Sequence, residues 1–252
     1  MSVSRGEQAS GRSDSGIFRV GSEWTDYVGA MILGSDISAG RLRPGPAGQG
    51  GLSREEVSKS QRGRLALAAV SAVGEVGYGP TTIGDIVSRA RVARRTFYTM
   101  YATKDECFAE GFEIAVNIVA SRMASAVADV EVRDSHALVR TSLQAYLTIL
   151  ADEPVAARAL HVETLAAGPA VAEQRARMQS IFASRMRAAC RWAIAEGVVA
   201  AEPPDEIFDV LIGGIDDRIR ACLLGPGAAS LPALAPVLTA AALALFTATP
   251  GL

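Results

Sequence analysis

The chain has 252 residues, of which 49% are apolar, and its formal net charge is only −2. A chain of this length can bury a substantial core and can hold one large or two small domains. A net charge this close to zero excludes a protein that binds polyanions through bulk charge. The charge is unevenly distributed, however. Residues 51–110 carry nine basic and seven acidic side chains, whereas residues 111–252 carry eleven and fifteen. A local positive surface on an acidic body is therefore expected.

Cysteine usage and hydropathy indicate the cellular compartment in which the protein is expected. The three cysteines are widely spaced and include no CxxC pair, so a disulfide framework is not expected and a reducing cytoplasm is favoured. The most hydrophobic stretch, residues 231–248, is mostly alanine and is interrupted by Pro232 and Pro236. We therefore expect no membrane span and no membrane partner.

Residues 1–52 are predicted to be an extension and linker, largely disordered or loosely docked. Residues 1–16 are rich in serine, glycine and arginine and contain no apolar run typical of a secretory signal. Residues 17–37 are more apolar, and either dock as a short element or come from a misassigned start. Residues 38–51 combine glycine and proline as linkers do.

A first helix is predicted from residue 54 to 76. Its apolar side chains recur at i, i+3 and i+4 on one face: Leu65, Ala66, Ala69, Val70, Val73 and Val76. Ser53 and Glu56 have the spacing of a capping box. Gly77 can end the helix because glycine adopts the left-handed conformation without steric cost.

Two short helices joined by a tight turn are predicted next. Thr81 or Thr82 caps the first of them, and the second covers about residues 94–101. Five basic side chains and no acidic one lie between Ile86 and Lys104, and aromatic residues are interleaved with them. Phe97 and Tyr101, four residues apart, are expected to face the core. A compact basic helix-turn-helix is what a phosphate-lined duplex groove requires.

The polar side chains of this segment suit contacts with a duplex. Arg94 and Arg95 begin the helix that would enter the major groove, where arginine binds guanine edges or phosphates. The Tyr98 hydroxyl lies one turn further along. Lys104 stands at the start of the next helix, which a Thr103–Glu106 capping box opens and which runs to about residue 127. The combined amide donors and cation there form an anion site.

Further helices are predicted at residues 134–151, 154–167, 170–196, 204–223 and 231–247, separated by proline and glycine breaks. With about nine helices, no convincing strand and no internal repeat, the chain is expected to be all-α.

The pattern T-T-I-x-D-I-x-x-x-A-x-V-x-x-x-T-F-Y-x-x-Y-x-x-K-x-x-C-F resembles the DNA-binding domain of TetR-family transcriptional regulators over about residues 55–108. The resemblance implies a helix-turn-helix DNA-binding domain at 53–104 and a larger helical ligand-binding and dimerisation domain at 105–252. It also implies release from DNA when a ligand moves the fourth helix. The DNA contacts that it implies are Thr82, Arg94, Arg95, Thr96, Tyr98 and Lys104.

Two residues depart from the family pattern. Arg91 stands where the turn usually has glycine, and a non-glycine residue with positive φ costs about 1 kcal/mol. Ala93 stands where a serine or threonine usually caps the third helix, which forfeits about 1 kcal/mol. Arg91 can offset this with a phosphate contact or by pairing with the end of the preceding helix.

The C-terminal part shows no catalytic constellation and no metal or cofactor motif. If the resemblance holds, side chains of residues 111–200 enclose a largely apolar ligand cavity, although plain core packing is the default explanation for each candidate. The candidate ligand-binding residues are Phe112, Val116, Tyr146, Leu147, His161, Glu163, Phe182 and Trp192. The effector is then expected to be an apolar or amphipathic small molecule.

Residues 207–224 and 231–246 are the expected homodimer surfaces, because their small side chains permit close helix approach; alternatively, they cover the core of a monomer. The favoured interpretation is a dimeric, ligand-responsive regulator, a repressor of a palindromic duplex operator. The alternative is a helical small-molecule-binding protein that no longer reads DNA. A helical enzyme is disfavoured by the scarcity of histidine.

Overall fold

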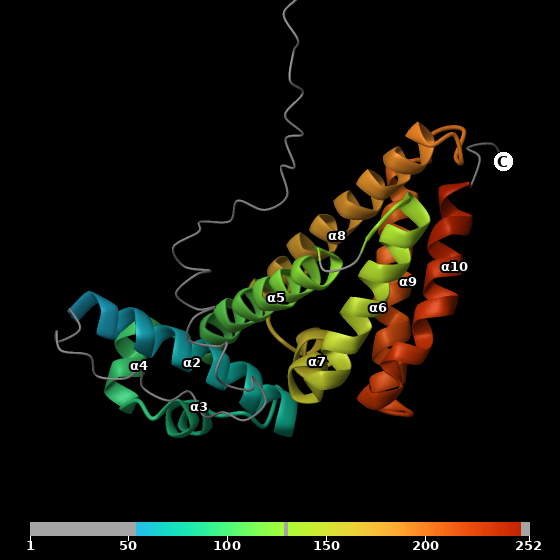
Figure 1. Ribbon diagram of the computed structural model, residues 1–252. Helices are drawn as coiled ribbons and strands as arrows, with labels where there is room; N and C mark the ends of the chain where they lie inside the picture. Colours follow the sequence, from blue (N-terminus) through green and yellow to red (C-terminus); the bar gives the residue numbers. More distant parts are fainter. Residues whose placement is uncertain (1–53, 129–130, 248–252) are drawn as a thin grey trace, which may run out of the picture.

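The computed structural model describes residues 54–128 and 131–247, and over these ranges it contains helices and no strand (Figure 1). The predicted all-α class is confirmed. The predictions for residues 1–53, including the Ser53–Glu56 capping box, lie outside the described residues.

The described ranges hold nine α-helices and two 3-10 helices: α2 Arg54–Val76, α3 Ile83–Ala90, α4 Arg94–Met100, α5 Lys104–Ala128, α6 Ser135–Asp152, α7 Pro154–His161, η2 Glu163–Leu165, α8 Pro169–Ala195, α9 Asp205–Leu224, η3 Ala228–Leu234 and α10 Ala235–Phe246. Most boundaries agree with the sequence predictions within about two residues, as expected when caps and glycine stops define helix ends.

Two predicted helices are divided. The helix expected over residues 154–167 ends at His161 and continues as η2, where the Thr164 hydroxyl donates to the Leu160 carbonyl at 3.1 Å. The helix expected over 231–247 begins with η3, which contains Pro232, before α10 starts. Proline removes a helical amide donor, so the tighter 3-10 turn precedes a regular helix here.

The helices α2, α3 and α4 form an N-terminal head at one end of the molecule, and α9 and α10 form the opposite edge (Figure 1). One buried cluster joins the head to α5, α7 and the first half of α8 through residues such as Leu65, Phe97, Phe112 and Met178. A second cluster joins α6, α8, α9 and α10. The head therefore shares its core with the following helices rather than closing one of its own.

Two glycines allow α2 to touch its neighbours backbone to backbone. A Cβ added at Gly111 of α5 would lie 2.2 Å from the Ala66 carbonyl oxygen, and one at Gly74 would lie 2.0 Å from the Val155 carbonyl oxygen of α7. No larger residue fits at either position without movement of the backbone, so the head is fixed closely on α5 and α7.

By length and composition alone, two described segments, α5 and Ala228–Phe246, are long and apolar enough to cross a membrane. Both contribute side chains to the buried clusters, and core helices of all-α proteins meet the same criteria.

Candidate nucleic-acid interface and buried cavity

Thr82 caps α3 in a reciprocal arrangement. Its hydroxyl oxygen accepts the Asp85 amide at 3.2 Å, and the Asp85 carboxylate accepts the Thr82 amide at 2.8 Å. Hydrogen bonds from the Thr82 hydroxyl and amide lower the pKa of the exposed Asp85 carboxyl. Thr81 is buried instead, and its hydroxyl donates to the Gly77 carbonyl at 2.7 Å.

The backbone of the turn between α3 and α4 is strained because a non-glycine residue has a positive φ. Arg91 has φ 52 and ψ 47, and within the described ranges it is the one non-glycine residue with positive φ. Ala93 stands at the N-cap of α4 in an extended conformation and makes no side-chain capping bond. The structure therefore contains both predicted departures from the family pattern, which are the positive φ at Arg91 and the missing side-chain cap at Ala93.

The short helix α4 is anchored by aromatic side chains and leaves its basic side chains outside. Phe97 and Tyr101 are 0% and 3% exposed, as predicted, whereas Tyr98 is 52% exposed. Arg94 and Arg95 are exposed, and an Arg94 guanidinium nitrogen lies 3.4 Å from the Tyr98 hydroxyl. Anchoring one face of a seven-residue helix in the core holds its opposite face to solvent.

Some arginines near α4 form ion pairs with acidic residues, and others do not. Arg62 pairs with Glu110 at 2.6 Å, and Arg89 pairs with Glu75 at the same distance. In the part of the chain that the structure describes, Arg91, Arg94 and Arg95 have no acidic partner. We call the exposed side chains of Thr82, Arg91, Arg94, Arg95 and Tyr98 the basic surface.

Lys104 lies beside this surface but is engaged with the backbone. Its ammonium group donates to the carbonyls of Tyr78, Gly79 and Thr81 at 2.8, 3.3 and 3.0 Å. It also lies 4.5 Å from the centre of the Tyr78 ring. Lys104 therefore holds the turn between α2 and α3, and its DNA contact stays a prediction.

A cavity lies in the second half of the molecule, among α5, α6, α7, α8 and α9. The enclosed volume is small, about 40 Å³, and the cavity opens to solvent. Its wall is mainly apolar: Met123, Ser142, Leu143, Tyr146, His161, Met178, Gln179, Phe182, Met186, Ile212, Ile215, Asp216 and Ile219. A pocket of this kind suits an apolar molecule or the apolar part of an amphiphile.

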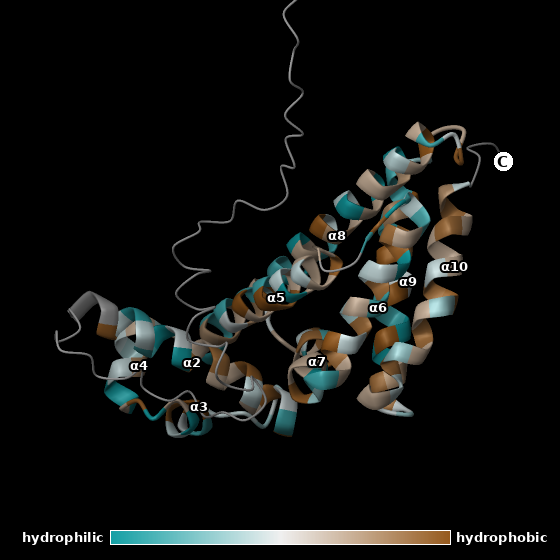
Figure 2. Cartoon of the chain, viewed as in Figure 1, coloured by the Kyte–Doolittle hydropathy of each residue, from teal (hydrophilic) through white to brown (hydrophobic). Residues whose placement is uncertain are grey.

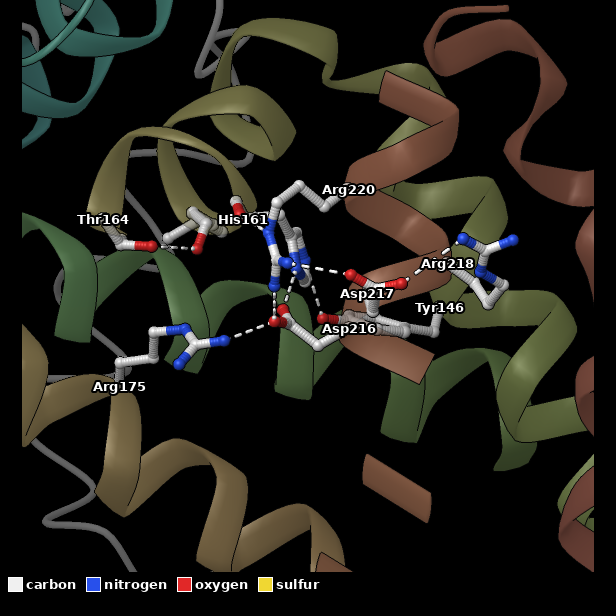
Figure 3. Close-up of polar contacts among 9 residues, drawn as sticks. Tyr146, His161, Thr164, Arg175, Asp216, Asp217, Arg218 and Arg220 are labelled. Atoms are coloured by element: carbon white, nitrogen blue, oxygen red, sulfur yellow. Dashed lines mark hydrogen bonds and ion pairs between the residues drawn. The ribbon is translucent and has the colours of Figure 1, made fainter. Parts of the chain in front are cut away.

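Five polar side chains meet beside the cavity and form what we call the polar cluster: Tyr146, His161, Arg175, Asp216 and Arg220 (Figure 3). Tyr146, His161 and Asp216 line the cavity, whereas the two arginines do not. The Tyr146 hydroxyl lies 3.0 Å from Nε2 of His161, and Nδ1 of that ring lies 2.7 Å from the Asp216 carboxylate. The other Asp216 oxygen accepts from both arginines. These contacts join α6, α7, α8 and α9.

The electrostatics of the polar cluster favour an ionised Asp216. Burial by itself would raise the pKa of this carboxyl, but the hydrogen bond and charge of His161, together with Arg175, outweigh burial and lower the pKa to about 2. Burial raises the pKa of the Tyr146 hydroxyl, so this group remains a neutral hydrogen-bonding partner.

Residues 66–110, which span the basic surface, match the bacterial regulatory proteins of the tetR family. The chain therefore contains a DNA-binding domain of the TetR type. No curated protein sequence matches the chain significantly.

Solved structures of TetR-type regulators share the fold of this chain. The fatty acid degradation regulator FadR from Bacillus halodurans has a TM-score of 0.64 and 16% identity, over 73% of this chain and 94% of that chain. FadR from Bacillus subtilis, solved in complex with stearoyl-CoA, has a TM-score of 0.62 and 16% identity, over 71% and 96%. A TetR transcription regulator from Haloarcula marismortui has a TM-score of 0.59 and 20% identity, over 73% and 96%. These structures are transcription regulators, and at such identities they establish the fold alone.

The candidate ligand residues separate into two groups. Tyr146, His161 and Phe182 are on the cavity wall. The following five candidates are not part of it: Phe112, Val116, Leu147, Glu163 and Trp192. Phe112 and Val116 pack with the head, and Leu147 is fully buried in the second cluster. Helical periodicity indicates which residues face the interior, but the rotation of each helix decides which of them meet a cavity.

Among the charged residues in the middle of α9, Asp216 and Arg220 belong to the polar cluster. Both point inward to His161, while Asp217 and Arg218 remain exposed. A signal was present: Asp216 interrupts the apolar stripe of Ile212, Ile215 and Ile219 on α9. A carboxylate on a buried helical face requires partners.

Proposed function

We propose that this TetR-family regulator is a repressor that binds a palindromic operator as a homodimer and leaves it when an apolar or amphipathic small molecule fills the cavity. The observation that carries the proposal is the basic surface, where three exposed arginines lie on or beside an aromatic-anchored helix and pair with no acidic residue among those that the structure describes. A cytoplasmic location follows from such a role.

On DNA, α4 would lie in the major groove. Arg94 and Arg95, at its first turn, would contact guanine edges or phosphates, and Thr96 and Tyr98 would add hydroxyl contacts. Thr82 at the start of α3 and Arg91 in the turn would bind the backbone. In this arrangement base recognition comes from the arginines of α4, and orientation comes from the surrounding contacts.

The second copy would dock on α9 and α10. Val210, Leu224 and Val237 are 64%, 60% and 58% exposed, and a Cβ at Gly213 or Gly214 would meet nothing within 4 Å. Figure 2 shows α10 as largely hydrophobic at this open edge. An isologous four-helix interface would cover this face and would place two heads about one DNA turn, ~34 Å, or somewhat more apart.

The cavity supports the choice of effector. Its wall carries methionine, leucine, isoleucine and phenylalanine, with the polar cluster confined to one end. The Bacillus subtilis FadR structure contains stearoyl-CoA, which shows that a protein with this fold can bind a ligand that has a long apolar chain. We infer a ligand whose apolar part lies along this wall.

Selection of random duplexes on the full-length protein, followed by sequencing, tests the proposal. A palindrome with two half-sites is expected. Arg95→Ala should then weaken operator binding about 10-fold or more and relax the base preference, because one arginine–guanine contact contributes roughly 1–3 kcal/mol. Arg177→Ala, which removes an exposed arginine from α8, should leave the footprint unchanged. Equal footprints for wild type and Arg95→Ala would contradict the proposed reading mode.

The alternative is a ligand-binding protein that has lost DNA reading. The strained turn at Arg91 and the uncapped start of α4 favour it. Salt dependence separates the two. Specific binding should weaken steeply as salt rises, because each neutralised phosphate releases counterions, and the alternative predicts no enriched duplex at any salt concentration.

A further inference from the structure

Glu163 faces the N-terminal head rather than the cavity. It is the first residue of η2, two residues beyond His161, which lines the cavity at the end of α7. The Glu163 carboxylate accepts the backbone amide of Tyr78 at 3.0 Å and a guanidinium hydrogen of Arg158 at 2.8 Å. Its side chain is only 11% exposed, so the bond to the amide is protected from water.

The amide that Glu163 binds belongs to the turn that positions the reading helices. This segment, Gly77–Thr81, which we call the Tyr78 turn, begins at Gly77 with φ 94 and leads directly to the Thr82 cap of α3. From α5, Lys104 binds three of its carbonyls and Asp105 accepts the Tyr78 hydroxyl. Burial, followed by the bond to Asp105, raises the pKa of Tyr78 to about 12, so this hydroxyl keeps its proton.

The end of α7 also makes hydrogen bonds on the side that faces the cavity. Nε of Arg220 donates to the His161 carbonyl at 3.2 Å, while the His161 ring contacts Tyr146 and Asp216 (Figure 3). A molecule seated against Tyr146 and His161 therefore presses on the last turn of α7. Two residues of chain connect that turn to Glu163, so a displacement of 1–2 Å would break a hydrogen bond of 3.0 Å.

We propose that Glu163 is the positioning residue through which the cavity controls the head. With the cavity empty, Glu163 holds the Tyr78 amide and thereby the orientation of α3 and α4. With the cavity filled, the end of α7 moves and Glu163 releases the Tyr78 turn. This mechanism rests on the proposed ligand-responsive function and adds a defined route for its regulation.

The test uses a side chain as the occupant, because the effector is unidentified. Ser142 lies on the cavity wall one helical turn before Tyr146, so Ser142→Phe places a ring beside the polar cluster. Operator binding of the full-length protein is measured by fluorescence anisotropy for wild type, Ser142→Phe, Glu163→Ala and the double variant. Each single change should lower operator affinity about 10-fold, within the 5–150-fold range of allosteric couplings.

The double variant tests whether the occupant of the cavity acts on the head through Glu163. If the occupant acts through Glu163, the double variant should bind about as weakly as either single variant. Multiplication of the two effects to about 100-fold, or normal binding by Ser142→Phe, would overturn the proposal. Packing of α7 directly on α2 at Gly74 and Val155 would give the multiplicative result.

Two matched variants complete the design. Glu163→Gln keeps an oxygen that can accept the Tyr78 amide, so it should restore operator affinity and the response to Ser142→Phe. Glu173→Gln alters an exposed carboxylate on α8 and should change neither. Failure of the glutamine variant to rescue would show that the acceptor at this position is not the coupling group.

Hydrogen exchange gives a readout that does not depend on DNA. Amide exchange of the Tyr78 turn should rise in both Glu163→Ala and Ser142→Phe, with α10 unchanged. If no duplex is ever bound but this exchange rises, the proposed DNA function fails and the Glu163 linkage stands. If operator binding is normal and Ser142→Phe leaves the exchange unchanged, the linkage fails and the DNA function stands.

Discussion

The two ends of the molecule use arginine in opposite ways. On α4, Arg94 and Arg95 are exposed and have no acidic partner among the described residues. In the polar cluster, Arg175 and Arg220 are mostly buried and converge on one oxygen of Asp216. A hydrated arginine contributes little to folding and remains available to a phosphate, whereas a buried one contributes to the fold only while its partner stays in place. The same residue type therefore marks a binding surface at one end and a structural junction at the other.

The two ends also differ in local helix stabilisation. The N-cap of α6 is Asp134, whose carboxylate accepts the Ala137 amide at 2.6 Å. The N-cap of α4 is Ala93, two residues after the strained Arg91, and it makes no such bond. Helix α4 is thus held by its aromatic anchors and its neighbours more than by its own N-terminus, and it should respond more readily to forces from those neighbours.

The largest expected effect comes from the buried end. Asp216→Ala leaves two arginines of the polar cluster without their shared carboxylate, and breaking a buried ion pair of this kind costs about 3–5 kcal/mol. Urea unfolding should show this loss. Asp217→Ala, at a carboxylate whose side chain is 60% exposed, should change stability by less than about 0.5 kcal/mol. Equal losses for the two variants would remove the distinction between a buried and a solvated carboxylate.

The junction between the two ends should be nearly as sensitive. Gly111→Ala places a methyl group 2.2 Å from the Ala66 carbonyl oxygen, so α5 and α2 must separate. We expect a loss of about 1–3 kcal/mol, as for other overpacked sites, measured by urea unfolding. Hydrogen exchange should rise in both helices, and a variant as stable as the wild type would show that the two helices do not approach as closely as described.

Acid should weaken the buried end selectively. The pKa of the Asp216 carboxyl is lowered to about 2 from its ordinary value of 3.8, so its contribution to stability is fully present above about pH 4 and is lost as the pH falls through 2. The shift corresponds to about 2 kcal/mol. Unfolding measured from pH 5 to pH 2 should show this loss in the wild type and a smaller one in Asp216→Asn. Parallel pH profiles would contradict the assignment.

The smallest effect should come from the strained turn of the head. Arg91→Gly removes the penalty of a left-handed non-glycine residue and should stabilise the protein by up to about 1 kcal/mol. Arg91→Ala removes the same side chain but keeps the penalty, so it should give no such gain. Thermal unfolding of the two variants therefore separates backbone strain from the loss of charge, and identical midpoints would show that the turn is not strained.

Local signals made the head predictable from the sequence. Gly77, Thr82 and the spacing of Phe97 and Tyr101 each act within about one helical turn, and all four occupy the positions expected of them. The family match over residues 66–110 agrees with the same pattern. Only the choice between Thr81 and Thr82 as the cap needed the structure, because both hydroxyls have the right reach.

The cavity was less predictable because its wall depends on how five helices rotate against one another. The apolar pattern correctly indicated that Leu147 and Phe182 face inward, yet only Phe182 meets the cavity. Glu163 and Lys104 were assigned to a ligand and to DNA, whereas both bind the backbone of the Tyr78 turn. Their partners lie more than twenty residues away in the chain, beyond the range of any local pattern.

The shared core has a consequence for protein engineering. A chimaera joined at residues 104 and 105 would cut between the first two residues of α5 and separate Leu65 and Phe97 from Phe112. A transplantable unit would have to carry α5 through Gly111 together with the α7 surface that meets Gly74. Exchange of ligand-binding domains among such regulators would therefore depend on whether the shared core between the head, α5 and α7 is preserved. How well each half performs in its parent protein would not decide the outcome.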